Sequence, residues 1–398
     1  MDVAARLAAL DDAGLRRRLR VVSGPQGARV VLDGRPVLLL CSNNYLGLAD
    51  HPAVCQAAAD AALRWGAGSG ASRLVSGTMT VHRRLEERLA AFEGREAALL
   101  FGSGYLANTG VVQALAPAGT VVCSDELNHA SIVDGCRLAR AETFVYRHGD
   151  LEHLAWGLER AAGRASLVVT DGVFSMDGDV APLTELVPLA HRHGARVVVD
   201  EAHGTGCLGP GGRGAAAEAG VDVDVVVGTL GKALGSYGAY AACSAELAEL
   251  LLNTARPFIF STAPPPPSVA AALAALDLLE AEPERVDRLQ AGAQVLRHAL
   301  AREGFDVSGS ESQIVPIVVG EAAQAVRFCE LALEEGVFAS AIRPPTVPEG
   351  TSRLRLSVMA THTRDELREA ARALGRAALK AGFRPGAGVP AIAARQAA

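Results

Sequence analysis

Lysine is almost absent from this sequence. Its 38 basic residues are 36 arginines and two lysines, Lys232 and Lys380. A guanidinium stays protonated, whereas a lysine amine can lose its proton and attack a carbonyl carbon. A position that keeps lysine against this bias therefore indicates chemistry that arginine cannot perform. Lys232 follows the apolar run Val225–Val227 and is the candidate, although a surface or helix-capping lysine is the alternative. Lys380 lies at a predicted helix end, where we expect a surface charge.

Paired cysteines, long apolar runs and excess positive charge are also missing. The seven cysteines are odd in number and no two have C-x-x-C spacing, which fits a reducing compartment and argues against a disulfide framework or a cysteine zinc site. No apolar run approaches the ~20 residues that a membrane helix needs. The net charge of −6 argues against a general nucleic-acid role. We therefore expect no nucleic-acid or membrane partner.

Targeting and metal-binding signals are equally scarce. Only residues 7–10 form an apolar stretch before Asp11 and Asp12, so no signal peptide is predicted, and these acidic residues argue against a mitochondrial presequence. We expect a cytoplasmic protein. His191 and His193 lie near a predicted helix end without a third ligand nearby, so we expect no metal site.

The middle of the chain predicts an α/β fold with a mainly parallel central sheet. Short Val-rich runs at 167–170, 197–200 and 225–228 are typical of buried parallel strands, and helical periodicity connects them. After about residue 290 the pattern predicts a helix, a strand, a helix, strands at 337–342 and 353–358, and a last helix. The expected organisation is an N-terminal arm with a helix and a strand (1–45), a large domain (46–285), a smaller α+β domain (286–385) and a disordered tail (386–398).

Polar side chains follow the three Val-rich runs. The carboxyl ends of neighbouring parallel strands meet at one edge of a sheet, and ligands bind there. The sequence therefore predicts a crevice lined by Asp171, Ser175, Asp177 and Asp179 after the first run, Asp200 and His203 at the second, and Thr229 and Lys232 after the third.

Two further features fit a phosphate-bearing cofactor at that edge. Gly102–Asn108 is a glycine turn that enters a predicted helix, where free N–H groups and the helix dipole attract phosphate. Asp200 ends a buried strand, so its carboxylate needs a partner, and a protonated pyridine nitrogen is one. For His203 a hydrogen-bonded loop histidine is the alternative.

The chain resembles the α-oxoamine synthase family of fold-type I pyridoxal-phosphate (PLP) enzymes from about residue 15 to 380. The segments that carry the resemblance are Ser42–Leu48, Leu127–Ser131, Asp171–Gly178, Val199–Gly206, Gly228–Lys232 and Arg343–Pro348. A dinucleotide oxidoreductase would need a G-x-G-x-x-G turn after its first strand and a serine hydrolase a G-x-S-x-G motif, and both are missing.

The resemblance implies a role for each residue of a composite site. Lys232 would bind PLP as a Schiff base, Asp200 would pair with the ring nitrogen, His129 would stack on the ring and His203 would contact the ring oxygen. The cofactor and its phosphate would also contact Gly104, Tyr105, Ser175, Thr229 and, from a neighbouring subunit, Thr262. The amino-acid carboxylate would bind Asn43 and Arg355, and the acyl substrate would face Arg16 and Thr346.

The implied reaction is a decarboxylative condensation of an amino acid with an acyl thioester in a homodimer with shared sites. The segment Arg343–Gly350 favours L-alanine and a pimeloyl thioester, whereas Leu127–Gly135 also suits relatives that use glycine. Coenzyme A and an acyl carrier protein both remain open as the carrier of the acyl group.

Overall fold

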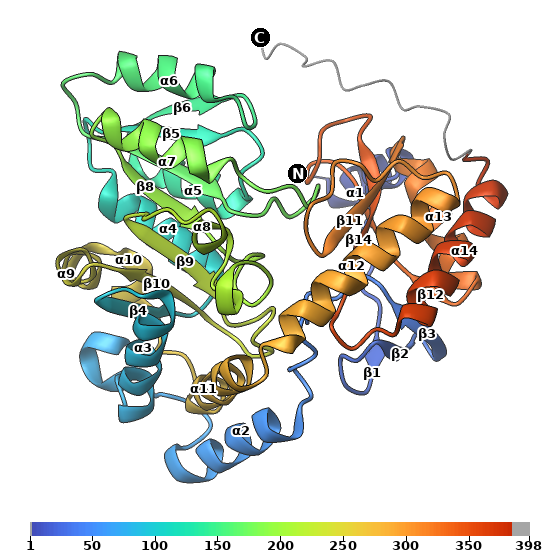
Figure 1. Cartoon of the computed structure of the whole chain (residues 1–398), viewed down its shortest axis with the longest axis horizontal. Helices are drawn as coiled ribbons and strands as arrows, with labels where there is room; N and C mark the ends of the chain where they lie inside the picture. Colours follow the sequence, from blue (N-terminus) through green and yellow to red (C-terminus); the bar gives the residue numbers. More distant parts are fainter. Residues whose placement is uncertain (1, 384–398) are drawn as a thin grey trace. The chain divides into compact units, whose positions relative to one another are not determined.

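A seven-stranded sheet forms the core of one part of the computed structural model, which describes residues 2–383 (Figure 1). The strands run in the order β4-β10-β9-β8-β7-β5-β6. Their bounds are β4 Ala97–Phe101, β5 Val121–Asp125, β6 Glu142–Tyr146, β7 Ser166–Asp171, β8 Arg196–Asp200, β9 Val225–Thr229 and β10 Ala239–Cys243. Strand β10 is antiparallel to both neighbours and all other pairs are parallel. The predicted α/β fold with a mainly parallel sheet is confirmed.

The valine runs form strands because helices cover both faces of this sheet. Val197, Val198 and Val199 are all fully buried, as expected for a strand without a solvent face. One face packs against α4, α5, α9 and α10 in a single apolar cluster that includes Val111, Ile132, Leu251 and Phe258. The helices are α2 Pro52–Trp65, α3 Thr80–Glu93, α4 Gly104–Leu115, α5 Ala130–Ala139, α6 Leu151–Arg160, α7 Leu183–Arg192, α8 Ala215–Glu218, α9 Ala245–Thr254, α10 Arg256–Phe260 and α11 Pro266–Ala281, with short turns η1 Arg73–Gly77 and η2 Pro210–Gly212.

The chain forms two compact units. The large unit comprises residues 48–175 and 179–286 and contains the seven-stranded sheet. The small unit comprises residues 2–47, 176–178 and the described residues from 287 onward. The segment predicted as an N-terminal arm thus belongs to the same unit as the C-terminal region, and the predicted tail at 386–398 lies outside the described residues.

The small unit contains two sheets. One has the order β1-β2-β3-β12 and the other β11-β14-β13. The elements are α1 Val3–Asp12, β1 Val22–Ser23, β2 Arg29–Leu32, β3 Arg35–Leu39, α12 Glu284–Arg302, which begins in the large unit, β11 Ile314–Gly320, α13 Ala322–Glu334, β12 Val337–Phe338, β13 Ser340–Ile342, β14 Ser352–Ser357 and α14 Arg364–Lys380. Within the described residues, no helix is both long and apolar enough to cross a membrane.

Two sequence expectations for this unit were wrong in detail. The N-terminal 45 residues contain three strands after their helix rather than one. The strand expected at 337–342 is two strands that pair in different sheets, β12 with β3 and β13 with β14. Ala339 separates them, is fully buried and accepts a hydrogen bond from Cys329 Sγ at 3.0 Å, so packing breaks a run that contains no glycine or proline.

Candidate active site

The carboxyl ends of β7, β8 and β9 bring acidic and basic groups together in the large unit. Asp171 ends β7 and lies directly opposite Asp200, the last residue of β8. Both carboxylates are at least nine-tenths buried. Burial, together with the charge of Asp200, raises the pKa of Asp171 well above its usual value. Two adjacent buried carboxylates do not both ionise readily, so Asp171 favours the protonated form beside Asp200.

Lys232 lies in the loop after β9, next to a histidine. Its Nζ is 2.8 Å from His203 Nε2, and the lysine is half-buried. Gly235 shapes this loop because its φ of +59° is left-handed and an added Cβ would lie 2.4 Å from the backbone nitrogen of Ala49. The ammonium also acts on Asp171 and His129, whose pKa values it lowers. Lysine, acids and His129 therefore form one electrostatic cluster.

Asp200 accepts two hydrogen bonds. The backbone N–H of Ala202 donates to Oδ1 at 2.8 Å, and Asn108 Nδ2 donates to Oδ2 at 2.5 Å. Each carboxylate oxygen of Asp200 therefore accepts from one donor. An ionised aspartate at a buried strand end suits a cationic ring nitrogen as its third partner.

His129 caps the N-terminus of α5 and is fixed from two sides. Its backbone N–H donates to Asp171 Oδ2 at 2.9 Å, and its Nδ1 accepts from the backbone N–H of Ser131 at 3.2 Å. His129 as a whole residue is exposed, while its ring nitrogen makes part-buried contacts. Desolvation by the surrounding protein lowers the pKa of His129, and Lys232 lowers it further against the opposing effect of Asp200.

The N-terminus of α4 offers a phosphate cradle. Ser103 caps the helix by accepting from the backbone N–H of Leu106, and Gly104 is the first helical residue. An added Cβ at Gly104 would meet no atom within 4 Å, so the approach to these N–H groups is open. The ring of Tyr105 is exposed and its hydroxyl donates to Asp134 Oδ2 at 2.5 Å.

The remaining predicted cofactor contacts lie on loops and strand ends. Thr229 ends β9, donates from Oγ1 to the carbonyl of Gly238 at 3.1 Å and accepts from the N–H of Gly231 at 3.3 Å. Ser175 is half-buried after β7. Thr262 is exposed and pairs with Ser72 in an isolated β-bridge.

These residues fit PLP. A lysine amine matches its aldehyde, the buried carboxylate of Asp200 matches its ring nitrogen, and the open helix N-terminus at Gly104 matches its phosphate. All three groups belong to the large unit. No cluster of three or more potential metal ligands is present among residues 2–383.

The predicted amino-acid residues lie in the small unit and contact each other. Arg355 of β14 is buried and donates from Nη1 to Asn43 Oδ1 at 3.2 Å and to Ser357 Oγ at 3.0 Å. Its Nη2 donates to Tyr45 Oη at 3.2 Å, and Tyr45 Oη donates to Asn43 Oδ1 at 3.0 Å. An oriented guanidinium of this kind suits a carboxylate, which it can bind with two parallel hydrogen bonds.

The predicted acyl-substrate residues are more exposed. Arg16 is exposed, follows the end of α1 and forms an ion pair with Asp11 in the last turn of that helix. With Arg18 and Arg343 it lines a cavity of about 270 Å³. Thr346 is exposed, and its N–H donates to the carbonyl of Arg343 at 3.1 Å.

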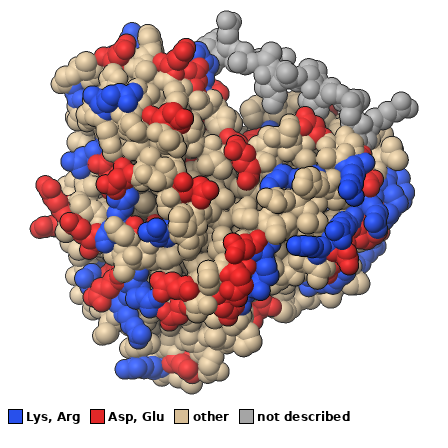
Figure 2. Space-filling view, in the orientation of Figure 1, with Lys and Arg blue, Asp and Glu red and all other residues tan. Residues whose placement is uncertain are grey.

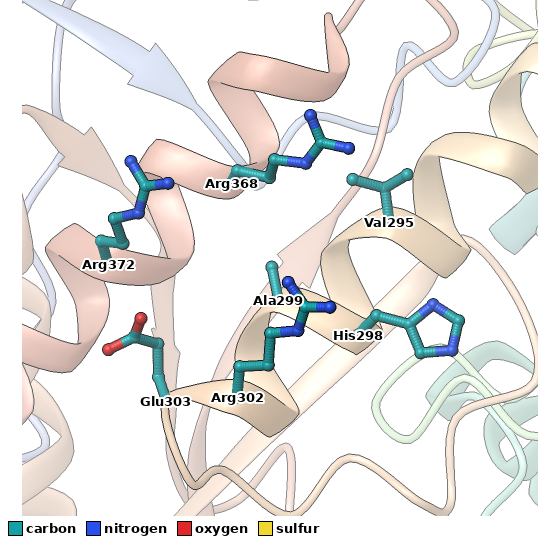
Figure 3. Close-up of a pocket in the computed structure, with 7 residues that line it drawn as sticks. All are labelled: Val295, His298, Ala299, Arg302, Glu303, Arg368 and Arg372. Atoms are coloured by element: carbon teal, nitrogen blue, oxygen red, sulfur yellow. The ribbon is translucent and has the colours of Figure 1, made fainter.

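A larger cavity of about 400 Å³ contains none of the predicted site residues. It lies between α12 and α14 and is lined by Val295, His298, Ala299, Arg302, Glu303, Arg368 and Arg372 (Figure 3). Basic side chains gather over these helices in Figure 2. Arg368 and Arg372 also pair with acids one turn away on α14, Asp365 and Glu369. The strand ends bring together groups with a defined chemistry, whereas this cavity does not. We therefore place the candidate site at the strand ends.

Sequence reasoning missed three residues that hold predicted site residues in place within their own units. Asn108 and Ser131 connect Asp200 with His129, and Tyr45 supports Arg355. Ser131 ends a segment that carries the resemblance, and Asn108 ends the glycine turn predicted to bind phosphate. A buried asparagine among apolar helix residues needs polar partners, which was the available signal for Asn108.

Comparison with protein families gives one match over most of the chain. Residues 35–374 match the family described as Aminotransferase class I and II. An 8-amino-7-oxononanoate synthase of Geobacter sulfurreducens is 57% identical over 380 residues, which cover 94% of this chain and 97% of that protein. A second, from Anaeromyxobacter dehalogenans, is 57% identical over 362 residues, covering 90% of this chain and 91% of the relative.

Solved structures give the same fold. A variant serine palmitoyltransferase from S. paucimobilis with a bound PLP–myriocin aldimine has a TM-score of 0.91 at 35% identity, covering 96% of this chain and 97% of that one. An 8-amino-7-oxononanoate synthase from Francisella tularensis has a TM-score of 0.75 at 27% identity, covering 87% and 99%. The fold is therefore that of fold-type I PLP transferases.

Proposed function

This chain belongs to the 8-amino-7-oxononanoate synthases, PLP-dependent acyltransferases of biotin biosynthesis within the class I and II aminotransferase family, and we propose that it condenses L-alanine with a pimeloyl thioester. The products are 8-amino-7-oxononanoate, carbon dioxide and the free thiol. The observation that carries the proposal is 57% identity along 97% of a relative with that name. The agreement of the segment Arg343–Gly350 with this branch of the family adds to it.

Lys232 is the proposed covalent anchor and proton-transfer group. PLP, when bound, supplies an electron sink for the negative charge that develops at the amino-acid α-carbon. We propose that the Lys232 amine removes the α-proton and returns a proton after decarboxylation. The contact of its Nζ with His203 at 2.8 Å supports this role, because it holds the amine in one place while still leaving it half-exposed.

Asp200 and His129 are proposed to control the cofactor ring. Ionised Asp200 would keep the ring nitrogen protonated, and two donors to its carboxylate support that state. His129 would stack on the ring, and His203 would contact the ring oxygen. Gly104, Tyr105, Ser175 and Thr229, with Thr262 of a second subunit, are the proposed phosphate and cofactor contacts.

The substrates are proposed to bind residues of the small unit. Arg355 and Asn43 would hold the alanine carboxylate and so orient the amino acid. Arg16 and Thr346 would face the acyl donor, with Arg16 pairing with the terminal carboxylate of pimelate. We further propose a cytoplasmic homodimer with shared sites, whose donor is carried by coenzyme A or by an acyl carrier protein.

A thiol-release assay tests the proposed substrates. Alanine, glycine and serine are each paired with pimeloyl, acetyl, succinyl and palmitoyl thioesters of coenzyme A, and pimeloyl acyl carrier protein is added as a fifth donor. The highest kcat/KM is expected for alanine with a pimeloyl donor. A methyl-sized pocket favours alanine over glycine by only ~1–3 kcal/mol, so slow reaction with glycine agrees with the proposal. Preference for glycine with an acetyl donor would instead assign the chain to the glycine C-acetyltransferases.

A further inference from the structure

A continuous chain of polar contacts connects the two residues proposed to hold the cofactor ring. Asn108 Nδ2 donates to Asp200 Oδ2 at 2.5 Å and to Ser131 Oγ at 2.9 Å. Ser131 Oγ is 2.7 Å from His129 Nδ1. Asn108 lies on α4 and Ser131 on α5, and both are almost fully buried. Two packed helices thus carry a polar path from β8 to the start of α5.

The orientation of the Asn108 amide follows from its neighbours. Both hydrogens of Nδ2 have an acceptor, whereas Oδ1 is buried and has no hydrogen-bond partner among the described residues. The reversed amide would place Oδ1 against the Asp200 carboxylate, where two acceptors repel. Leaving an amide oxygen unsatisfied in the interior has a cost, and the charge-assisted bond to Asp200 offsets it only if that carboxylate is ionised.

The tautomer of His129 follows from the same path. Since Ser131 Oγ accepts from Asn108, its own hydrogen is directed to His129 Nδ1. The backbone N–H of Ser131 also points at Nδ1, at 3.2 Å. Two donors aimed at Nδ1 require that this nitrogen carries no proton, so the neutral ring is protonated at Nε2.

Other charged groups around the path are few and identifiable. Asp171, opposite Asp200 on β7, accepts from the His129 backbone, and Lys232 acts on both Asp171 and His129. Glu201 follows Asp200 in the chain, but its carboxylate accepts from the backbone N–H groups of α8 at 2.9 and 2.7 Å. Within residues 2–383, Asp200 is the only one of these three acids that accepts a hydrogen bond from a side-chain amide.

We propose that Asn108 and Ser131 are positioning residues that hold Asp200 ionised toward the ring nitrogen of PLP and hold His129 neutral with its proton on Nε2. The inference rests on the proposed function, because it concerns the groups that face the cofactor ring. Neither residue needs to touch the cofactor. Without Asn108 the Asp200 carboxylate loses its side-chain donor, so the proton shared with the ring nitrogen moves toward Asp200.

The first test uses Asn108→Ala with Thr109→Val as the matched control. Thr109 is also buried on α4, but its hydroxyl donates only to carbonyls of that helix, at 2.8 and 3.2 Å. PLP labelled with ¹⁵N in the ring is bound to each protein. In Asn108→Ala the ¹⁵N resonance should move toward that of an unprotonated pyridine, and the Kd for PLP should rise roughly tenfold or more. Thr109→Val should leave both unchanged.

The second test uses Ser131→Ala in the protein without cofactor. Removing one donor to Nδ1 makes the neutral form of the ring less stable, so the NMR titration midpoint of His129 should move to higher pH. The His129 signal is assigned by its loss in His129→Gln. Thr109→Val should leave this midpoint unchanged.

If Asn108→Ala does not fold, Asn108→Ser replaces it in the first test, because a serine side chain ends one atom short of the amide nitrogen and cannot keep the bond to Asp200.

The outcomes separate this inference from the proposed function. The proposed positioning roles are overturned if the Asn108 variant keeps the wild-type ¹⁵N resonance and Kd, or if the His129 midpoint does not move in Ser131→Ala. In either case, PLP binding by the wild type would still support the proposed function. Failure of the wild-type protein to bind PLP through lysine would overturn the function itself.

Discussion

The proposed cofactor region and the proposed substrate region differ in how their groups are held. In the large unit, Asp200, His129 and Lys232 influence one another through charge, and α4, α5, β7 and β8 supply their partners. In the small unit, Arg355 meets Asn43 and Tyr45, while Arg16 is exposed beside Asp11. The first arrangement fixes protonation states, and the second only orients hydrogen-bond donors. Variants in the large unit should therefore change the chemical step, and variants in the small unit should change KM.

Lys232→Arg should have the largest effect. A guanidinium cannot bond covalently to the cofactor aldehyde or accept the α-proton, so activity should fall by at least ~10³-fold while the fold is retained. Circular dichroism measures whether the fold is retained, and the visible absorbance of the protein with PLP measures whether the covalent bond to the cofactor forms. Lys380→Arg is the control, since that exposed lysine pairs with Glu335. Near wild-type turnover in Lys232→Arg would remove the basis of the comparison.

Asp200→Asn should bind cofactor yet exchange the α-proton of alanine slowly. An amide cannot keep the ring nitrogen protonated, and the loss of a preorganised charge at a reacting centre typically costs ~10²–10³-fold. Deuterium exchange into alanine in heavy water measures this step without the acyl donor. Exchange at the wild-type rate would show that the buried acid does not act on the ring.

Arg355→Gln should act mainly on the affinity for the amino acid. Losing a charge-assisted pair with a carboxylate should raise the KM for alanine roughly tenfold to a hundredfold, with a smaller change in kcat. The control Arg376→Gln alters an exposed arginine that pairs with Glu335 and Glu369. A large loss of kcat at unchanged KM would contradict the division between the two regions.

His148 tests stability in the large unit without touching the proposed chemistry. Burial lowers the pKa of His148, but contacts with Asp125 at 3.0 Å and Asp179 at 2.8 Å outweigh it and raise the pKa to about 10. Since the folded pKa lies above the unfolded value near 6.5, the stabilisation is fully present below pH ~6.5 and is lost as pH rises toward ~10.

The corresponding variant is His148→Gln. Its Tm should lie several degrees below that of the wild type at pH 6 and approach it at pH 10, because the ion pairs contribute only to the protonated ring. Thermal unfolding of both proteins across this range measures the difference. A difference in Tm that does not change with pH would mean that His148 stabilises the fold by packing, for example against Phe174, whose ring centroid is 4.4 Å from that of His148.

Arg16→Ala should have the smallest effect. An exposed arginine in an ion pair contributes little to stability, so only the pairing with the donor carboxylate is at risk. We expect the KM for a pimeloyl thioester to rise roughly threefold to tenfold, with no change for an acetyl thioester. Equal changes for both donors would mean that Arg16 does not recognise the distal carboxylate.

The two regions also differ in how far the sequence predicted them. The valine runs predict β7, β8 and β9, and the polar residues after them predict an edge with Asp200 and Lys232, because strand formation and burial follow from local pattern. The contact of Asn108 with Asp200 joins residues 92 positions apart through helix packing, which no local pattern encodes. Likewise, Arg355 and Tyr45 lie 310 residues apart, and only the resemblance had singled out Arg355.

The central claim is that Lys232 carries the cofactor, and borohydride reduction tests it most directly. The protein with PLP is reduced, digested and mapped by mass spectrometry, which reports the lysine that bears the label. Since the sequence contains only two lysines, the label can lie on Lys232 or on Lys380. The account predicts that the label lies on Lys232 alone. Label on Lys380, or none on either lysine, would contradict it.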